Sequence, residues 1–237
     1  MVLENRVVVI TGATGGLGRV VAHSMAERGA RLAFLGRSIE RLEQLASEIG
    51  LAEDRYLAVE VDLGNPVEVE TAAETVAGKF KKIDVLLHLV GGWTGGKSVV
   101  EADPDDVSTM LSQHVWTTFY MAQAFIPHLV DNKWGRLIIV SSPFAASPRA
   151  KGAPYAMGKA AQEALMLTLA QELKGTGVTA NILLVKTIDV KHSRENDPSP
   201  KNAFWTTPEE IANAALYLCS DEAKMVNGAR LPLYGSQ

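Results

Sequence analysis

The chain has 237 residues, a length that suits one large α/β domain or two small ones. Its formal net charge of −4 leaves no basic footprint, so nucleic acid is not an expected partner. The single Cys219 excludes an internal disulfide and suits a reducing compartment, and the first residues lack a signal-peptide pattern, so we expect a cytoplasmic protein.

Apolar runs rich in β-branched residues alternate with helical patterns along the whole chain. In chain order, the patterns predict strands at 6–11, 31–35, 56–61, 83–90, 136–140, 178–185 and 229–233. They predict helices at 17–28, 39–49, 67–80, 104–130, 155–174 and 208–219. Most of the strands are apolar without strict alternation, which is typical of a parallel sheet covered by helices on both faces. We therefore expect a single α/β domain over residues 1–237.

A glycine-rich turn, Thr11-Gly-Ala-Thr-Gly-Gly-Leu-Gly18, joins the first predicted strand to the first predicted helix. Gly12 would permit a tight turn, Gly16 a close approach of backbone N–H groups to a pyrophosphate, and Gly18 close packing of helix on strand. A turn that only requires positive φ is the alternative. The position between strand and helix favours a nucleotide, because the helix N-terminus attracts its negative charge. The expected cofactor contacts here are Gly12, Thr14, Gly15, Gly16, Leu17 and Gly18.

The second predicted strand ends at Gly36-Arg37, without the acidic residue that would accept the ribose hydroxyls of NAD. Arg37 suits a 2′-phosphate instead, so NADP is the expected cofactor and NAD the alternative; a solvated arginine at a helix start is the plainer interpretation. Asp62 and Leu63 follow the third strand as further cofactor contacts. There Asp62 either touches the adenine or caps the next turn.

Two glycine pairs bracket a lone tryptophan in residues 88–96, HLVGGWTGG, which follow the fourth predicted strand. Ligands of such sheets bind outside the carboxyl ends of the strands, so Val90, Gly91 and Gly92 are expected cofactor contacts. Trp93 either stacks on a flat substrate or covers the edge of the cleft.

Residues 107–130 carry no Asp, Glu, Lys or Arg, but they hold too many polar side chains for a lipid-facing span. No membrane partner is therefore expected, and a helix buried on several sides, at a subunit interface, is the better interpretation. Residues 191–207 form a polar, linker-like stretch with two prolines. Their place after the sixth strand favours a substrate lid over a solvated surface excursion.

Tyr155 and Lys159 stand at positions i and i+4, which places them on one face of a helix. A neighbouring ammonium favours the phenolate, so it would lower the tyrosine pKa from ~10 toward use as an acid or base near neutrality. Ser142 closes the fifth strand, where its hydroxyl would hydrogen-bond a substrate carbonyl oxygen. A Tyr-x-x-x-Lys pair alone is usually coincidence. Joined to the glycine turn and the strand-end serine, it is a strong signal.

With these motifs, Asn181 in the sixth strand and Thr207-Pro-Glu-Glu-Ile-Ala near the end, the chain resembles the short-chain dehydrogenase/reductase family over essentially its whole length. The resemblance implies a Rossmann-type, doubly wound parallel sheet of about seven strands with helices on both faces. It implies an NAD(P)-dependent oxidoreductase, often a tetramer formed through the helix at 107–130 and its neighbour. We therefore expect a homo-oligomer, dimer or tetramer.

The resemblance also implies roles for single residues. Tyr155 would pass a proton to a carbonyl oxygen while the nicotinamide delivers hydride to the carbon. Ser142 would orient and polarise that carbonyl, and Lys159 would lower the tyrosine pKa and hold the nicotinamide ribose. The turn after the sixth strand, with Ile188, would add cofactor contacts.

The chain departs from the family pattern at three places. His88-Leu-Val-Gly91 replaces the usual Asn-Asn-Ala-Gly, and His114 aligns with the active-site asparagine. His114 either relays protons through water, since histidine titrates near neutrality, or is a packing substitution. Val185-Lys186 replaces Pro-Gly, where Lys186 favours an acidic substrate or a phosphate. The remaining histidines lack ligand spacing, so no metal site is expected.

Three functions remain open. The first is an NADP(H)-dependent oxidoreductase for a carbonyl or alcohol substrate. The second rests on residues 91–96 and 113–117, GGWTGG and QHVWT, which are similar to dihydropteridine reductases, enzymes that reduce a quinonoid pterin. The third is a low-turnover, cofactor-binding regulatory protein.

Overall fold

Residues 3–235, which the computed structural model describes, form one seven-stranded sheet in the order β3-β2-β1-β4-β5-β6-β7. All strand pairs are parallel. The strands are β1 Val7–Thr11, β2 Arg31–Gly36, β3 Tyr56–Glu60, β4 Val85–His88, β5 Gly135–Ser141, β6 Val178–Leu184 and β7 Arg230–Pro232. The strand order reverses between β1 and β4, the topological switch point where such sheets bind ligands. The predicted doubly wound fold is confirmed.

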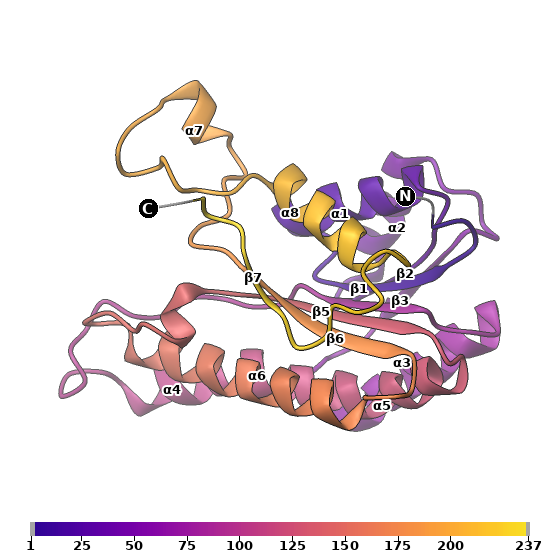
Figure 1. Cartoon of the computed structure of the whole chain (residues 1–237), viewed down its shortest axis with the longest axis horizontal. Helices are drawn as coiled ribbons and strands as arrows, with labels where there is room; N and C mark the ends of the chain where they lie inside the picture. The colour runs from indigo at the N-terminus through magenta and orange to yellow at the C-terminus, as the bar shows by residue number, and fades with distance from the viewer. Residues whose placement is uncertain (1–2, 236–237) are drawn as a thin grey trace.

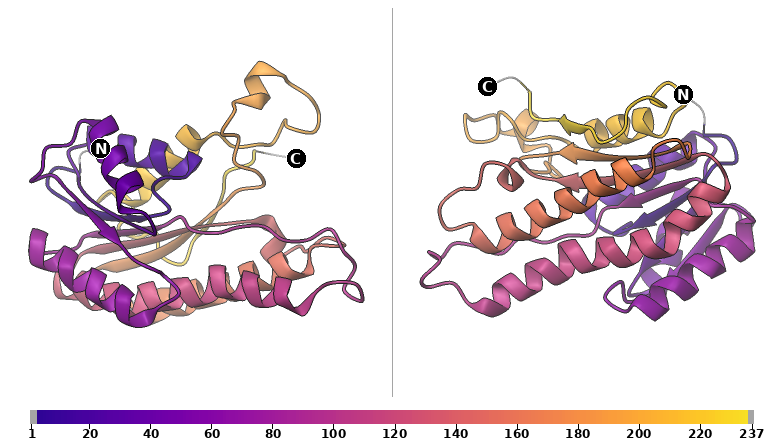
Figure 2. Two further views of the ribbon diagram at one scale, coloured as in Figure 1. Left: turned by 180° about the vertical axis from the view of Figure 1, so that it is seen from behind. Right: turned by 60° about the horizontal axis from the view of Figure 1, so that its bottom comes forward.

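Helices cover both faces of the sheet, as Figure 1 shows. One face carries α1 (Gly16–Glu27), α2 (Ile39–Ile49) and α8 (Pro208–Leu218). The other carries α3 (Pro66–Phe80), α4 (Pro104–Leu111), α5 (Thr117–Asp131) and α6 (Ala153–Glu172). In the right view of Figure 2, the α4–α5 segment lies between α3 and α6.

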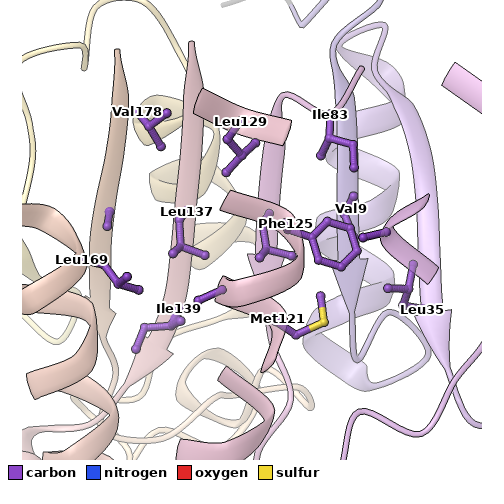
Figure 3. Packing of buried hydrophobic residues seen from close by; sticks show 14 of the residues in the cluster. Val9, Leu35, Ile83, Met121, Phe125, Leu129, Leu137, Ile139, Leu169 and Val178 are labelled. Atoms are coloured by element: carbon purple, nitrogen blue, oxygen red, sulfur yellow. The ribbon is translucent and has the colours of Figure 1, made fainter. Parts of the chain in front are cut away.

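Each face of the sheet has its own apolar core, because neighbouring strand residues point to opposite sides. Val9 of β1 packs under Phe125 of α5, whereas Val8 belongs to the cluster beneath α1 and α8. Figure 3 shows the first of these cores, in which Met121 and Phe125 meet side chains from several strands. This two-sided burial explains why the strands are apolar runs without alternation.

Side-chain caps mark the starts of α2, α3, α4 and α8. Ser38 caps α2, Asn65 caps α3 and Asp103 caps α4, each by accepting a hydrogen bond from a backbone N–H of the first turn. Thr207 and Glu210 form a reciprocal capping box at α8. Because these local signals are visible in the sequence, the predicted helices 39–49 and 67–80 agree closely with α2 and α3.

The segment predicted to be helical at 104–130 is helical throughout, but it is not one continuous α-helix. A π-helical turn, η1 (Ser112–Trp116), separates α4 from α5 and carries the buried His114. Such turns insert one extra residue per turn and often occur at functional sites, but no residue pattern announces them. Among the described residues, no helix is long and apolar enough to span a membrane.

The linker-like residues 191–207 contain a short helix, α7 (Ser193–Asn196), and project beyond the sheet in Figure 1. The carboxylate of Asp189 accepts hydrogen bonds from the backbone N–H groups of Ser193 and Arg194, each at 2.8 Å. Arg194 also pairs with Glu210 at the start of α8. The segment is therefore anchored at its base, while its role as a substrate lid stays a prediction.

Candidate active site

The glycine turn adopts a geometry that only glycines allow. Gly12 has φ +71°, and a Cβ on Gly18 would lie 2.2 Å from the carbonyl oxygen of Gly12. The N-cap residue of α1, Gly15, supplies no side-chain cap, so the first N–H groups of this helix stay available to an anion. A Cβ on Gly16 would meet Val190, in the loop after β6, at 2.7 Å. The turn therefore packs closely and leaves the N–H groups at the start of α1 free, an arrangement that fits a bound pyrophosphate.

A cavity of about 640 Å³ opens beside this turn, and we call it the adenosine-side cavity. Seven of the predicted contacts line it: Gly12, Thr14, Arg37, Asp62, Leu63, Val90 and Gly91. Arg41 in the first turn of α2, which no sequence motif singled out, lines it too. Neither the guanidinium of Arg37 nor that of Arg41 has an ion-pair partner within residues 3–235. Two free cations thus face the space where a cofactor ribose would lie.

Asp62 caps the turn after β3, which is one of its two predicted roles, and its contact with an adenine stays a prediction. Its carboxylate accepts a hydrogen bond from the backbone N–H of Gly64 at 2.9 Å, which caps the turn. The same residue also lines the adenosine-side cavity.

A second cavity, of about 530 Å³, holds the groups suited to chemistry, and we call it the reaction-side cavity. The predicted residues that line it are Leu17, Val90, Gly91, Gly92, His114, Ser142, Tyr155, Lys159 and Ile188. The two cavities share Val90 and Gly91, so they meet at the end of β4. Gly15, Gly16 and Gly18 line neither cavity, and their contacts with a cofactor stay predictions.

Tyr155 lies at the start of α6 with aromatic edges on two sides. Its ring centroid is 5.6 Å from that of His114 and 5.9 Å from that of Phe144. Burial raises the pKa of Tyr155 above its usual value, and a hydrogen bond with Ser142 partly offsets this rise. The sequence predicted a lowered pKa, and the structure differs because the nearby ammonium is directed elsewhere. The phenol is therefore protonated at neutral pH and ready to act as an acid.

Lys159 is held deep beneath the reaction-side cavity. Its ammonium donates to the backbone carbonyl of Val140 at 2.8 Å and to Oε1 of Gln162 at 2.9 Å. An ammonium has three donors, so one remains for a ligand. A Cβ on Gly91 would lie 3.7 Å from Nζ, so the free donor lies beside the junction of the two cavities. Burial lowers the pKa of Lys159 to about 7, although the carboxylate of Glu163 opposes this.

His114 is a neutral imidazole in this site. Burial and the charge of Lys159 lower its pKa to about 3, and its Nε2–H donates to the carbonyl oxygen of Gly92 at 3.0 Å. Nδ1 is buried and has no hydrogen-bond partner among the described residues. A Cβ on Gly91 would lie 2.8 Å from Cε1 of the ring, so glycine is required there. His114 thus packs closely and also keeps one free acceptor, which leaves both of its predicted roles open.

His88 ties three elements together beneath the junction of the cavities. The hydroxyl of Thr117 donates to the carbonyl of Gln113 at 2.7 Å, so its oxygen accepts from Nε2 of His88 at 3.1 Å. Nδ1 of His88 then accepts from the hydroxyl of Thr11 at 2.9 Å. Burial lowers the pKa of His88 to about 3, which keeps the ring neutral. Strands β1 and β4 and the start of α5 are thereby linked.

A buried chain of polar side chains that no sequence motif indicated also contacts Lys159. Gln162 accepts from Lys159, and its amide donates to Oγ1 of Thr118 at 2.8 Å. The hydroxyl of Thr118 donates in turn to the backbone carbonyl of His114 at 2.6 Å. A polar side chain on the buried face of a helix requires partners, so the position of Gln162 within α6 was the available signal.

A second missed network lies next to the first. The hydroxyl of Ser141 donates to one carboxylate oxygen of Glu163 at 2.6 Å, and Arg230 of β7 pairs with the other at 2.7 Å. This network joins the end of β5, the helix α6 and the last strand. The carboxylate of Glu163 adds to the rise in the pKa of Tyr155. For Lys159, it partly offsets the lowering of the pKa that burial causes.

A family model described as short chain dehydrogenase matches residues 6–201. The chain belongs to the short-chain dehydrogenase family. The prediction of an oxidoreductase of this family is thereby confirmed, and the glycine turn, Ser142, Tyr155 and Lys159 all lie within the matched region.

Individual relatives align along nearly their whole length. D-threitol dehydrogenase of Mycolicibacterium smegmatis is 29 % identical over 243 residues, covering 98 % of this chain and 93 % of that protein. A 3-ketoacyl-(acyl-carrier-protein) reductase from Brucella melitensis, complexed with NADH, has a TM-score of 0.88 at 27 % identity and covers 99 % of this chain and 98 % of that one. A short chain dehydrogenase from Bacillus anthracis has a TM-score of 0.86 at 29 % identity, covering 97 % and 95 %. One of these relatives, the Brucella reductase, thus has a structure that contains NADH.

Proposed function

We propose that this short-chain dehydrogenase transfers hydride between NADP(H) and a carbonyl or alcohol substrate, with Tyr155 as the general acid or base. The observation that carries the proposal is the junction of the two cavities. Tyr155, Ser142 and Lys159 line the reaction-side cavity, which joins the adenosine-side cavity at Val90 and Gly91. A dinucleotide lying across this junction would bring its nicotinamide beside the phenol.

The residues present fit such a cofactor. The glycine turn leaves the start of α1 uncapped for the phosphates, and the free donor of Lys159 suits a ribose hydroxyl. Arg37 and Arg41 favour the 2′-phosphate of NADP over NAD, although the Brucella relative is complexed with NADH. When bound, the reduced nicotinamide supplies the hydride.

In the reductive direction, the protein handles the proton and the orientation of the substrate. The hydroxyl of Ser142 donates a hydrogen bond to the carbonyl oxygen and polarises it. Tyr155 transfers its proton to that oxygen as the new C–H bond forms, which yields an alcohol and the oxidised cofactor. Because burial raises the pKa of Tyr155, the phenol holds its proton until the substrate oxygen gains charge.

A quinonoid pterin is the second candidate substrate, because Trp93 offers a ring on which it could stack. This side chain lines the reaction-side cavity and is 62 % exposed, so its face is free to stack on a flat ring. The third function, cofactor binding with little turnover, differs from both because it predicts no product.

One screen separates the three functions. Purified protein would be mixed with NADPH and with aldehydes, ketones, 3-oxoacyl thioesters or quinonoid dihydropterin, and NADPH absorbance followed. Oxidation with a carbonyl supports the proposal, and oxidation with the pterin alone replaces it. Tight NADPH binding with no oxidation at all would leave the regulatory function.

We also propose that the protein is a homo-oligomer. Trp116, Phe119 and Tyr120 form an aromatic cluster around the start of α5, and the first two are 50 % and 37 % exposed. Exposed aromatic clusters of this kind mark interaction surfaces. Sedimentation should give a dimer or tetramer, and a monomer at micromolar concentration would reject the proposal.

A further inference from the structure

Lys186 places a second positive charge in the reaction-side cavity. It lies in the turn after β6, is half-buried and lines the cavity together with Ser142 and Tyr155. The residues that line this cavity include no Asp or Glu. The cavity is therefore cationic, which favours a substrate that carries a negative charge.

The two lysines of this cavity have different surroundings. Lys159 is tied to Val140 and Gln162, whereas Lys186 has no hydrogen bond or ion pair from its ammonium to any described residue. Its Nζ lies over the rings of Phe204, at 4.5 Å, and Tyr234, at 5.3 Å. Ring faces stabilise a cation without satisfying its three donors, so the ammonium remains available to an anion.

The strand register places Lys186 next to the reacting groups. Ser141 of β5 pairs with Leu184 of β6, so Ser142 and Lys186 stand just beyond the ends of adjacent strands. Adjacent strands lie about 4.8 Å apart. A substrate whose carbonyl oxygen meets Ser142 and Tyr155 therefore has its next few atoms within reach of a lysine side chain at 186.

We propose that Lys186 binds a carboxylate of the substrate, which makes the preferred substrate an oxo acid or the corresponding hydroxy acid. This inference rests on the proposed carbonyl chemistry and names its substrate class. Phe204 belongs to the 191–207 segment and Tyr234 to the end of the chain. Both rings line a neighbouring cavity and not the reaction-side cavity, so Lys186, which lines the reaction-side cavity, stands at its edge.

The test compares matched acids and amides. The probes are the 2-, 3- and 4-carboxybenzaldehydes and the three corresponding carbamoylbenzaldehydes, which carry a neutral amide in place of the carboxylate. Binding to protein saturated with NADP⁺, which has no hydride to give, is measured by calorimetry. Turnover is measured separately with NADPH.

Lys186→Met removes the charge and keeps the stem that packs on the rings. Lys224→Met is the control, because Lys224 is an exposed lysine outside the reaction-side cavity and outside the 191–207 segment. We expect at least one acid to bind about tenfold more tightly than its amide in the wild type and in Lys224→Met, and equally in Lys186→Met. NADP⁺ affinity should be the same in all three proteins.

Equal binding of every acid and its amide in the wild type, or an unchanged preference in Lys186→Met, overturns the inference. A loss of NADP⁺ affinity in Lys186→Met without any acid preference also overturns it, since the anion is then a cofactor phosphate. The proposed function fails separately: acid preference in binding with no NADPH oxidation by any carbonyl would keep the subsite and remove the reaction.

Discussion

The adenosine-side and reaction-side cavities are built in different ways. The first is formed mainly by the β1–α1 turn and the ends of β2 and β3, so most of its lining is contributed by a few short segments. The second combines short runs of residues at the ends of β4, β5 and β6 with His114 of η1 and with Tyr155 and Lys159 of α6. Its His114, Tyr155 and Lys159 are buried enough to have shifted pKa values. The lining of the adenosine-side cavity thus follows from local sequence motifs. The pKa values in the reaction-side cavity depend instead on side chains that are buried by segments far apart in the sequence.

Tyr155→Phe should separate turnover from cofactor binding most clearly. Removing the proton donor should lower kcat by about a thousandfold, because general acid catalysis contributes on that scale. Cofactor affinity should stay within about twofold, since the ring itself is retained. Tyr217→Phe, at an exposed tyrosine outside both cavities, is the control in the same turnover and fluorescence-binding assays. Equal turnover in the two variants would refute the proposed acid.

Gly18→Ala should damage cofactor binding most. Its Cβ would lie 2.2 Å from the carbonyl oxygen of Gly12, so the turn must move. We expect cofactor affinity to fall by about a hundredfold, measured by fluorescence titration. Gly78→Ala is the matched control, because this helical glycine has no heavy atom within 4 Å of its added Cβ. Wild-type affinity in Gly18→Ala would show that the turn does not hold the phosphates.

Arg37→Asp should change cofactor choice without changing the chemistry. A carboxylate repels a 2′-phosphate and accepts ribose hydroxyls, so the ratio of NADPH to NADH affinity should fall by about thirtyfold. Lys174→Asp introduces the same charge change at an exposed lysine outside both cavities and should leave the ratio unchanged. The same ratio in all three proteins would remove the phosphate role of Arg37.

Gln162→Leu tests whether the chain behind Lys159 positions its ammonium. Losing the acceptor leaves only Val140 to orient Nζ, so kcat should fall by about tenfold and the pH profile should shift. Gln162→Glu retains an acceptor and should restore most of the rate. Gln171→Leu, at an exposed glutamine of the same helix, is the control. A merely structural role would lower stability in Gln162→Leu and leave the pH profile of the folded enzyme in place.

The smallest effect is a pH dependence of stability. Lys159 has a pKa of about 7 when folded and 10.5 as a model group. Between these values the unfolded chain holds a proton that the folded chain lacks, so folding becomes more favourable as pH rises through this window. Relative to Lys159→Met, wild-type stability should rise by about 1 kcal/mol per pH unit between pH 7.5 and 9.5. Urea unfolding with parallel pH slopes for the two proteins would contradict this.

The features that the sequence predicts are those set by local motifs, and the features that it does not predict are set by tertiary packing. The glycine turn, Arg37 and the Tyr155–Lys159 pair lie in short motifs, so neighbouring residues suffice to single them out, and Gly12, Arg37, Tyr155 and Lys159 do line the two cavities. Their roles stay predictions. The raised pKa of Tyr155 was not, because it depends on what buries the ring. The π-helical turn at His114 and the partners of Gln162 were missed for the same reason. They arise where α4–α5 packs against α6, segments that lie far apart in the sequence.

The central claim is hydride transfer at the junction of the two cavities, with Tyr155 supplying the proton. NADPH deuterated at the transferring position of the nicotinamide tests it most directly, with the carbonyl substrate found in the screen. The alcohol formed by the wild type should carry one deuterium on its carbinol carbon, and Tyr155→Phe should form almost none while binding the cofactor normally. Full turnover by Tyr155→Phe, or alcohol without deuterium, would contradict the account.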